Sequence, residues 1–128
     1  MDAEKGSVAR WGLHCLLRLD RIESGEVLMK EETKMRTTAQ VLVDCLEAEG
    51  VDVIFGIPGE ETLDLMFAIR DSKIRFIPVR HEQGAAFMAD VYGRLTGRAG
   101  VCLSTLGPGA TNLVTGIATA YMDSVPMV

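Results

Sequence analysis

Residues 76–84, Phe76-Ile77-Pro78-Val79-Arg80-His81-Glu82-Gln83-Gly84, join a short apolar run to a helix of small residues. The apolar run indicates a buried strand. Glu82 lies at the junction of that strand and the helix, where a carboxylate is costly to desolvate. We therefore expect Glu82 either to find a partner or to stay protonated near neutral pH. It is the first candidate for proton chemistry in this sequence.

The alternation of strand and helix continues in both directions from this stretch. Before it, Thr37 or Thr38 caps a helix that Gly50 ends, with an apolar stripe of Val41, Leu42, Cys45 and Leu46. The pattern next predicts a strand over 51–55, a turn over 56–59, a helix over 60–71 and a strand over 75–79. It then predicts a helix over 82–96, a strand over 99–105, a tight turn over 107–109, a helix over 110–121 and a strand over 125–128.

Strands separated by helices of this length favour parallel pairing, because parallel strands need long crossover connections. We therefore predict an α/β fold, a doubly wound parallel sheet with helices on both faces. The last predicted strand ends with the sequence, although a strand of such a sheet is normally covered. We expect the sheet to be incomplete at the C-terminus and the chain to be the front of a longer protein.

The composition is that of an ordinary globular protein, with 48% hydrophobic residues, 24% charged residues and a net charge of -5. An acidic domain without a basic stripe argues against nucleic acid and anionic membranes as partners. No apolar run is long enough to span a membrane, and no secretory signal is recognisable. The separated cysteines Cys15, Cys45 and Cys102 have no metal-binding spacing and favour a reduced, cytoplasmic protein.

Residues 1–36 differ in character from the remainder. They mix charges with a short apolar patch and keep no continuous helical face. We expect a weakly ordered N-terminal extension over 1–36 and one folded domain over 37–128.

Small residues line two of the predicted helices. They are Gly84, Ala85, Ala86, Ala89 and Gly93 in the first, and Gly116 and Ala120 in the second. Such residues let helices pack closely. Packing within the core is the default interpretation, and a subunit interface is the alternative.

Open parallel sheets bind ligands at the carboxyl ends of their strands, and three such ends carry candidate residues here. They are Pro58-Gly59-Glu60, His81-Glu82, and Pro108-Gly109 with Asn112. Glycines in these turns let the backbone approach a flat ligand closely. His81 is either a base or a structural hydrogen-bonding residue. Glu60 is either a second site carboxylate or a partner of a helix dipole.

Four motifs in this order resemble thiamine diphosphate-dependent enzymes, and acetolactate synthase large subunits most of all. They are Phe55-Gly56-Ile57-Pro58-Gly59, the segment 80–89, Gly107-Pro108-Gly109-Ala110-Thr111-Asn112, and Asp123-Ser124-Val125-Pro126. The resemblance covers residues 37–128 and corresponds to the N-terminal pyrimidine-binding domain of these enzymes. Residues 1–36 have no recognisable counterpart.

By this resemblance, Glu82 is the catalytic glutamate that hydrogen-bonds the aminopyrimidine ring of the cofactor. A raised pKa would keep a proton of Glu82 available for sharing with the ring. The cofactor-binding residues would be Glu82, Pro58, Gly59, Pro108, Gly109 and Asn112. Glu60 and His81 would lie on the substrate side.

The resemblance also implies what the whole protein does. The full enzyme would decarboxylate pyruvate and condense it with a second 2-oxo acid, in branched-chain amino acid biosynthesis. It would be a homodimer or homotetramer, and its C-terminal domain would bind the diphosphate of thiamine diphosphate and Mg²⁺. FAD and a regulatory subunit are further components that the resemblance allows.

Because that C-terminal domain is absent from the sequence, the 128-residue chain alone would be inactive. One alternative is another thiamine diphosphate-dependent decarboxylase or carboligase. The other is a non-catalytic interaction domain of the same fold.

Overall fold

The structure, a computed structural model, describes residues 35–128. Most of the extension predicted over 1–36 therefore lies outside the described residues. In chain order the elements are α1 (Thr38–Ala48), β1 (Val53–Gly56), the 3-10 helix η3 (Glu60–Thr62), α2 (Leu63–Arg70), β2 (Arg75–Pro78), α3 (Glu82–Thr96), β3 (Val101–Leu103), α4 (Pro108–Asn112) and α5 (Val114–Met122).

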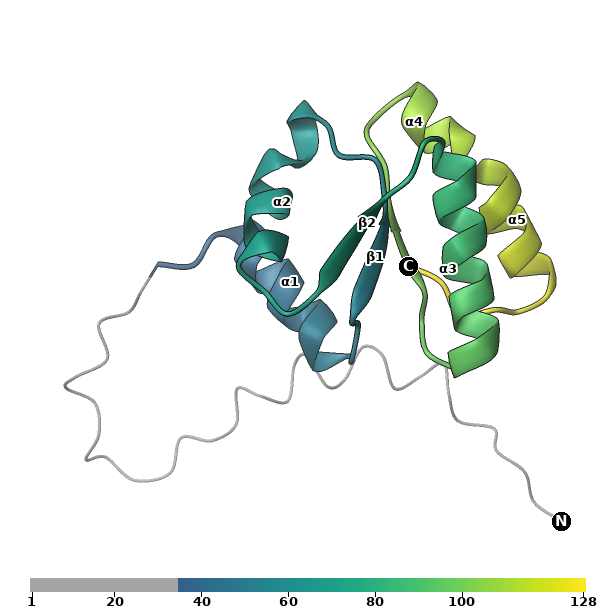
Figure 1. The fold of residues 1–128 in the computed structure, drawn as a ribbon, viewed down its shortest axis with the longest axis horizontal. Helices are drawn as coiled ribbons and strands as arrows, with labels where there is room; N and C mark the ends of the chain where they lie inside the picture. The colour runs from purple at the N-terminus through teal and green to yellow at the C-terminus, as the bar shows by residue number, and fades with distance from the viewer. Residues whose placement is uncertain (1–34) are drawn as a thin grey trace, which may run out of the picture. The chain divides into compact units, whose positions relative to one another are not determined.

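The strands form one parallel sheet in the order β2-β1-β3. In this register, Ile54 of β1 pairs with Phe76 of β2 and Val101 of β3. Figure 1 shows α1 and α2 on one face of the sheet and α3 and α5 on the other. Because both faces of β1 are covered, all of its residues are buried. The predicted α/β fold, a parallel sheet with helices on both faces, is confirmed.

One apolar cluster packs between the sheet and the helices α1 and α2. It consists of Val43, Ile54, Ala68, Ile69, Ile74 and Val101. Thr37 caps α1 as predicted, because its hydroxyl accepts from the Gln40 N–H while the Gln40 side chain accepts from the Thr37 N–H. The predicted apolar stripe is partly wrong. Val43 is the buried residue of α1, at 2% exposure, whereas Val41 and Leu42 are 46% and 49% exposed. The apolar run 41–43 offers more than one face, and docking on the sheet selects Val43.

The other face is packed against α3 through Val53, Phe55, Ala85 and Ala89. Ala85, Ala86 and Ala89 are fully buried, and a β carbon at Gly116 of α5 would lie 2.4 Å from the Ala86 Cβ. Core packing is therefore the role of these small residues, whereas Gly84 faces open space. The bounds of α3 match the prediction. It ends at Gly97, whose φ of 68° lies in the left-handed region that favours glycine.

The chain after β3 differs from the prediction. The turn 107–109 and the helix 110–121 are replaced by two helices, α4 and α5, that meet at Leu113. Pro108 opens α4, because proline suits the first helical position. At the join, the Leu113 N–H bonds back only three residues, to the Ala110 carbonyl. The strand predicted over 125–128 is a single parallel bridge between Gly100 and Met127.

Arg94 of α3 forms two ion pairs, one of which joins α3 to the end of α5. Its Nε lies 2.9 Å from Asp90 Oδ2, and its Nη2 lies 2.6 Å from Asp123 Oδ2. Asp90 is only 4% exposed, so the neighbouring guanidinium is the counter-charge that permits its burial. The carboxylates hold the pKa of Arg94 above its usual range. Ser124 follows with a φ of 55° and turns the chain toward the bridge at Met127.

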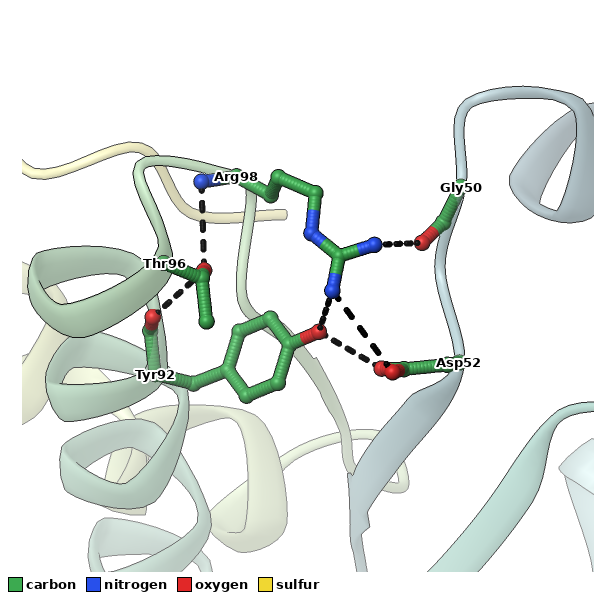
Figure 2. Close-up of polar contacts among 5 residues, drawn as sticks. All are labelled: Gly50, Asp52, Tyr92, Thr96 and Arg98. Carbon is green, nitrogen blue, oxygen red and sulfur yellow. Dashed lines mark hydrogen bonds and ion pairs between the residues drawn. The ribbon is translucent and has the colours of Figure 1, made fainter.

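Polar side chains join the segments at the amino-terminal edge of the sheet (Figure 2). The Tyr92 hydroxyl donates to Asp52 Oδ1 at 2.6 Å and accepts from Arg98 Nη2 at 2.9 Å. Arg98 Nη1 donates to the Gly50 carbonyl at 3.0 Å, and Nη2 lies 3.6 Å from Asp52 Oδ2. The Thr96 hydroxyl accepts from the Arg98 N–H and donates to the Tyr92 carbonyl. This network ties the segment before β1 to the end of α3.

Candidate active site

The carboxyl ends of β1 and β3 meet the start of α3 at one place. A β carbon added to Gly59, after β1, would lie 2.1 Å from Thr105 Cγ2. A β carbon added to Gly109, in α4, would lie 2.6 Å from Thr105 Oγ1 and 3.2 Å from Glu82 Oε1. Three segments separated in sequence are therefore in contact through Gly59, Thr105, Gly109 and Glu82. This juxtaposition is what a parallel sheet produces at the carboxyl edge of its strands.

Glu82 finds a partner on α4. The Asn112 side-chain amide donates to Glu82 Oε2 at 2.9 Å, although the two residues are 30 positions apart. Glu82 is 9% exposed and occupies the first position of α3. Its other carboxylate oxygen, Oε1, faces Gly109. The buried carboxylate is thus held by Asn112 at one oxygen, while the second lies close to the backbone of Gly109.

The expectation of a raised pKa for Glu82 is wrong for the chain as it stands. The Asn112 amide lowers the pKa of Glu82 below its ordinary value, and hydrogen bonding to the Glu82 backbone and the nearby His81 act in the same direction. Burial alone would raise the pKa, but its effect is smaller than that of the hydrogen bonds. Glu82 is therefore ionised at neutral pH, as a carboxylate that accepts hydrogen bonds.

The residues after β1 form a short constrained turn. The Thr62 hydroxyl accepts from the Gly59 N–H and donates to the Gly59 carbonyl, each at 3.0 Å. Pro58 is exposed at the carboxyl end of β1. Glu60 is exposed in the first turn of η3, where an acidic side chain suits the positive end of the helix. Within residues 35–128, η3 is not in contact with α3, so the structure does not bring the Glu60 and Glu82 carboxylates together.

His81 is the cap of α3. Its Nδ1 accepts from the Gln83 N–H at 3.2 Å, which is the structural hydrogen bond that the sequence left as one alternative. Arg80 is exposed, and in the described part of the chain it forms no ion pair with Glu82. Pro108 is exposed at the start of α4, with Gly109 buried beside it.

Thr105 ends the strand predicted over 99–105, but the sequence argument gave it no role in the site. It lies between two of the predicted glycines, yet a lone threonine after a strand gives no signal of its own. The only available indication was its place two residues before Gly107-Pro108-Gly109. Its importance depends on the approach of Gly59, which is a tertiary contact.

Other kinds of site are not indicated within residues 35–128. No group of three or more His, Cys, Asp or Glu side chains is placed there to hold a metal ion. No helix in this range is both long and apolar enough to cross a membrane. Cys45 and Cys102 are partly buried, and burial raises the pKa of the Cys102 thiol. Cys15 lies outside the described residues.

Several known proteins are similar to this chain. A probable acetolactate synthase large subunit of Methanocaldococcus jannaschii is 57% identical over 90 residues, which are 70% of this chain and 15% of the relative. An acetolactate synthase of Mycobacterium bovis is 56% identical over 93 residues, 72% of this chain and 15% of the relative. A probable 2-ketoarginine decarboxylase of Pseudomonas aeruginosa is 50% identical over 101 residues, 79% of this chain and 18% of the relative. The chain spans less than a fifth of the length of these relatives.

The family comparison covers the whole described domain. Residues 36–128 match the family described as thiamine pyrophosphate enzyme, N-terminal TPP binding domain. The matched range contains the sheet, the helices on both faces and the residues gathered around Glu82. The resemblance that the four motifs carry is thereby confirmed. The chain belongs to the thiamine pyrophosphate enzymes, and residues 36–128 are their N-terminal TPP-binding domain.

Proposed function

We propose that residues 36–128 form the pyrimidine-binding half of a thiamine diphosphate site in an acetolactate synthase-like enzyme. The observation that carries the proposal is the Glu82 carboxylate, which is buried and held by Asn112 at one oxygen while the other faces Gly109. The family supports the cofactor, and the relatives named acetolactate synthase support the reaction class.

The residues at this edge fit a flat ring that carries nitrogen-bound protons. Gly109 has no side chain, so the backbone of α4 lies close to Glu82 Oε1. Because Glu82 is ionised, Oε1 is suited to accept a hydrogen bond from a protonated ring nitrogen. Asn112 keeps the carboxylate oriented by occupying Oε2.

Glu82 would hold the ring and share a proton with it, while Gly109, Pro108, Gly59 and Pro58 would shape the surface beside it. Thiamine diphosphate, when bound, supplies the carbon centre that accepts electrons as a 2-oxo acid loses carbon dioxide. Glu60 and His81 would lie on the substrate side of the ring. Glu60 is exposed, and His81 caps α3.

The remaining expectations concern the rest of the enzyme. The chain covers less than a fifth of its relatives, so the diphosphate and Mg²⁺ site would belong to a further domain. On this proposal, the 128-residue chain alone is inactive. A homodimer or homotetramer, FAD, a regulatory subunit, branched-chain amino acid biosynthesis and a cytoplasmic location stay predictions.

A chimera tests the reaction. Residues 36–128 would replace the matching segment of the Methanocaldococcus jannaschii relative, which is 57% identical there. We expect the chimera to form acetolactate from pyruvate when thiamine diphosphate and Mg²⁺ are supplied. Glu82→Gln should lower the rate about 100-fold or more, the size of a general acid–base contribution. Gly84→Ala is the matched control, because its side chain would enter open space.

Two outcomes would contradict the proposal. A folded chimera that binds no thiamine diphosphate would exclude the pyrimidine role, and equal rates for the parent and Glu82→Gln would exclude the role of Glu82. The similarity to a probable 2-ketoarginine decarboxylase favours a second candidate, a thiamine diphosphate-dependent decarboxylase of another 2-oxo acid. Carbon dioxide release from other 2-oxo acids without acetolactate formation would favour that candidate. A folded chimera that binds the cofactor but turns over no 2-oxo acid would favour a non-catalytic domain.

A further inference from the structure

Thr105 follows β3 and lies between two glycines that belong to different segments. Its methyl group packs on Gly59, where an added β carbon would lie 2.1 Å from Cγ2. Its hydroxyl packs on Gly109, where an added β carbon would lie 2.6 Å from Oγ1. Real β carbons do not approach other atoms so closely, so each branch of the threonine lies directly on a glycine backbone.

The contact with Gly109 continues to Glu82. The same added β carbon on Gly109 would lie 3.2 Å from Glu82 Oε1, so Thr105 Oγ1 and Glu82 Oε1 flank one point. Asn112, which donates to Glu82 Oε2 at 2.9 Å, lies three residues further along α4. Gly109 and Asn112, which both neighbour the carboxylate, are therefore carried by α4, and Thr105 lies between α4 and the turn after β1.

We propose that Thr105 is a positioning residue for Glu82, whose two branches space α4 from the Gly59 turn and so hold Asn112 and Gly109 against the carboxylate. Thr105 acts through α4 and does not itself touch the reacting groups. The inference rests on the proposed function only in taking Glu82 as the proton-sharing group. The spacing itself is a property of the chain without cofactor.

The decisive variant is Gly59→Ala in the 128-residue chain. The φ of Gly59 is -149°, in the extended region that alanine adopts freely, so the new methyl acts mainly by pushing on Thr105. We expect displacement of Thr105 and α4 to weaken the Asn112–Glu82 hydrogen bond. Carbon-13 NMR titration of the Glu82 carboxyl should then show its pKa shifted upward from the wild-type value. His81, the titratable neighbour of Glu82, is present in both the wild-type and the variant protein, so the comparison isolates the effect of the substitution.

Two further variants make the comparison specific. Thr105→Ser removes the methyl on Gly59 but keeps the hydroxyl on Gly109, so Gly59→Ala/Thr105→Ser should return the Glu82 pKa toward the wild-type value. Gly84→Ala, whose β carbon meets nothing within 4 Å, should leave it unchanged although Gly84 is close to Glu82 in sequence. If the methyl group of Gly59→Ala disturbed Glu82 without acting through Thr105, the added Thr105→Ser substitution would not restore the Glu82 pKa.

The result that overturns the proposal is a Glu82 pKa in folded Gly59→Ala that equals the wild-type value. If Gly59→Ala does not fold, Thr105→Ala decides, because it removes both branches and introduces no clash. An upward shift there supports the spacing role, and an unchanged pKa overturns it. The titration needs no cofactor, so the two proposals can fail separately. An inactive chimera would contradict the proposed function, whereas a Glu82 pKa that does not respond to changes at Thr105 would contradict the positioning role.

Discussion

At the amino-terminal edge of the sheet, Asp52, Tyr92 and Arg98 are bound to one another, and Arg98 also binds the Gly50 carbonyl. At the carboxyl-terminal edge, the described part of the chain has one hydrogen bond between side chains, from Asn112 to Glu82. There the Thr62 and His81 side chains bond to nearby backbone groups. One edge joins separate segments through a network of polar side chains, whereas the other holds a single buried carboxylate through one side-chain amide.

The difference indicates that the two edges of the sheet have different roles. At the amino-terminal edge, hydrogen bonds stabilise the fold by joining the segment before β1 to the end of α3. Groups that must bind a ligand have to keep some hydrogen-bonding capacity, which costs stability if they are buried. The predictions below therefore concern stability at the amino-terminal edge and the state of Glu82 at the other.

The largest effect is expected from adding a side chain at Gly109, beside Glu82. In Gly109→Ala, the new methyl would lie 2.6 Å from Thr105 Oγ1, and overpacking of this kind costs about 1 to 3 kcal/mol. Gly84→Ala is the matched control, and it should instead stabilise α3 by about 0.5 to 1 kcal/mol. Urea unfolding of both variants measures the difference. A Gly109→Ala protein as stable as the wild type would mean that the edge is not closely packed.

Asp52→Ala should come next. It removes the acceptor of Tyr92 and the ion-pair partner of Arg98, and we expect a loss of about 1 to 1.5 kcal/mol in the free energy of unfolding, because these groups are partly exposed. Asp64→Ala is the control, since Asp64 is an exposed carboxylate of α2. Equal losses for the two variants would show that the network contributes nothing beyond surface charge.

Tyr92→Phe should cost slightly less, about 1 kcal/mol, and should change how stability depends on pH. The hydrogen bond to Asp52 raises the pKa of Tyr92 above its unfolded value near 10. The stabilisation is thus fully present below the unfolded pKa and is lost as the pH rises through the higher, folded pKa. Thermal unfolding between neutral and strongly alkaline pH should converge for the two proteins at the alkaline end. Parallel curves would contradict this.

Asn112→Ala should lower the stability at neutral pH, because it leaves the buried Glu82 carboxylate without its amide partner, and it should change the titration of Glu82. The folded pKa of Glu82 is lowered, so its stabilisation is present above the unfolded pKa and is lost as the pH falls through the folded value. Without the Asn112 amide, this acid-side loss should become shallower, and the Glu82 carboxyl should titrate at a higher pH. NMR titration together with acid unfolding tests both statements. An unchanged Glu82 titration would mean that the hydrogen bond is not formed in solution.

Local signals in the sequence were sufficient to predict those features of the fold that depend on neighbouring residues. The bounds of α3 follow from Glu82 after an apolar strand and from Gly97, whose left-handed backbone needs glycine. The parallel sheet follows from strands separated by long helices. The choice of Val43 over Val41 and Leu42 could not be predicted in this way, because an apolar run offers several faces and docking selects one.

The same distinction between local signals and tertiary contacts applies to the candidate site. The glycines, Glu82 and Asn112 were candidates from their motifs, but their mutual positions depend on contacts between residues far apart in sequence. The Asn112–Glu82 bond spans 30 residues, and it reverses the direction of the pKa shift that burial alone would give. Thr105 has no motif of its own, and the Asp52–Tyr92 bond spans 40 residues.

The sequence by itself thus determined the α/β class, the order of strands and helices as far as β3, and which residues stand at the strand ends. These features depend on periodicity, turn chemistry and capping, which act between neighbours. The tertiary structure alone decided that Glu82 is an ionised, oriented carboxylate, that Thr105 lies between Gly59 and Gly109, and that the amino-terminal edge is bonded to itself. Those features arise only when the sheet forms, because packing brings together groups that the chain keeps far apart.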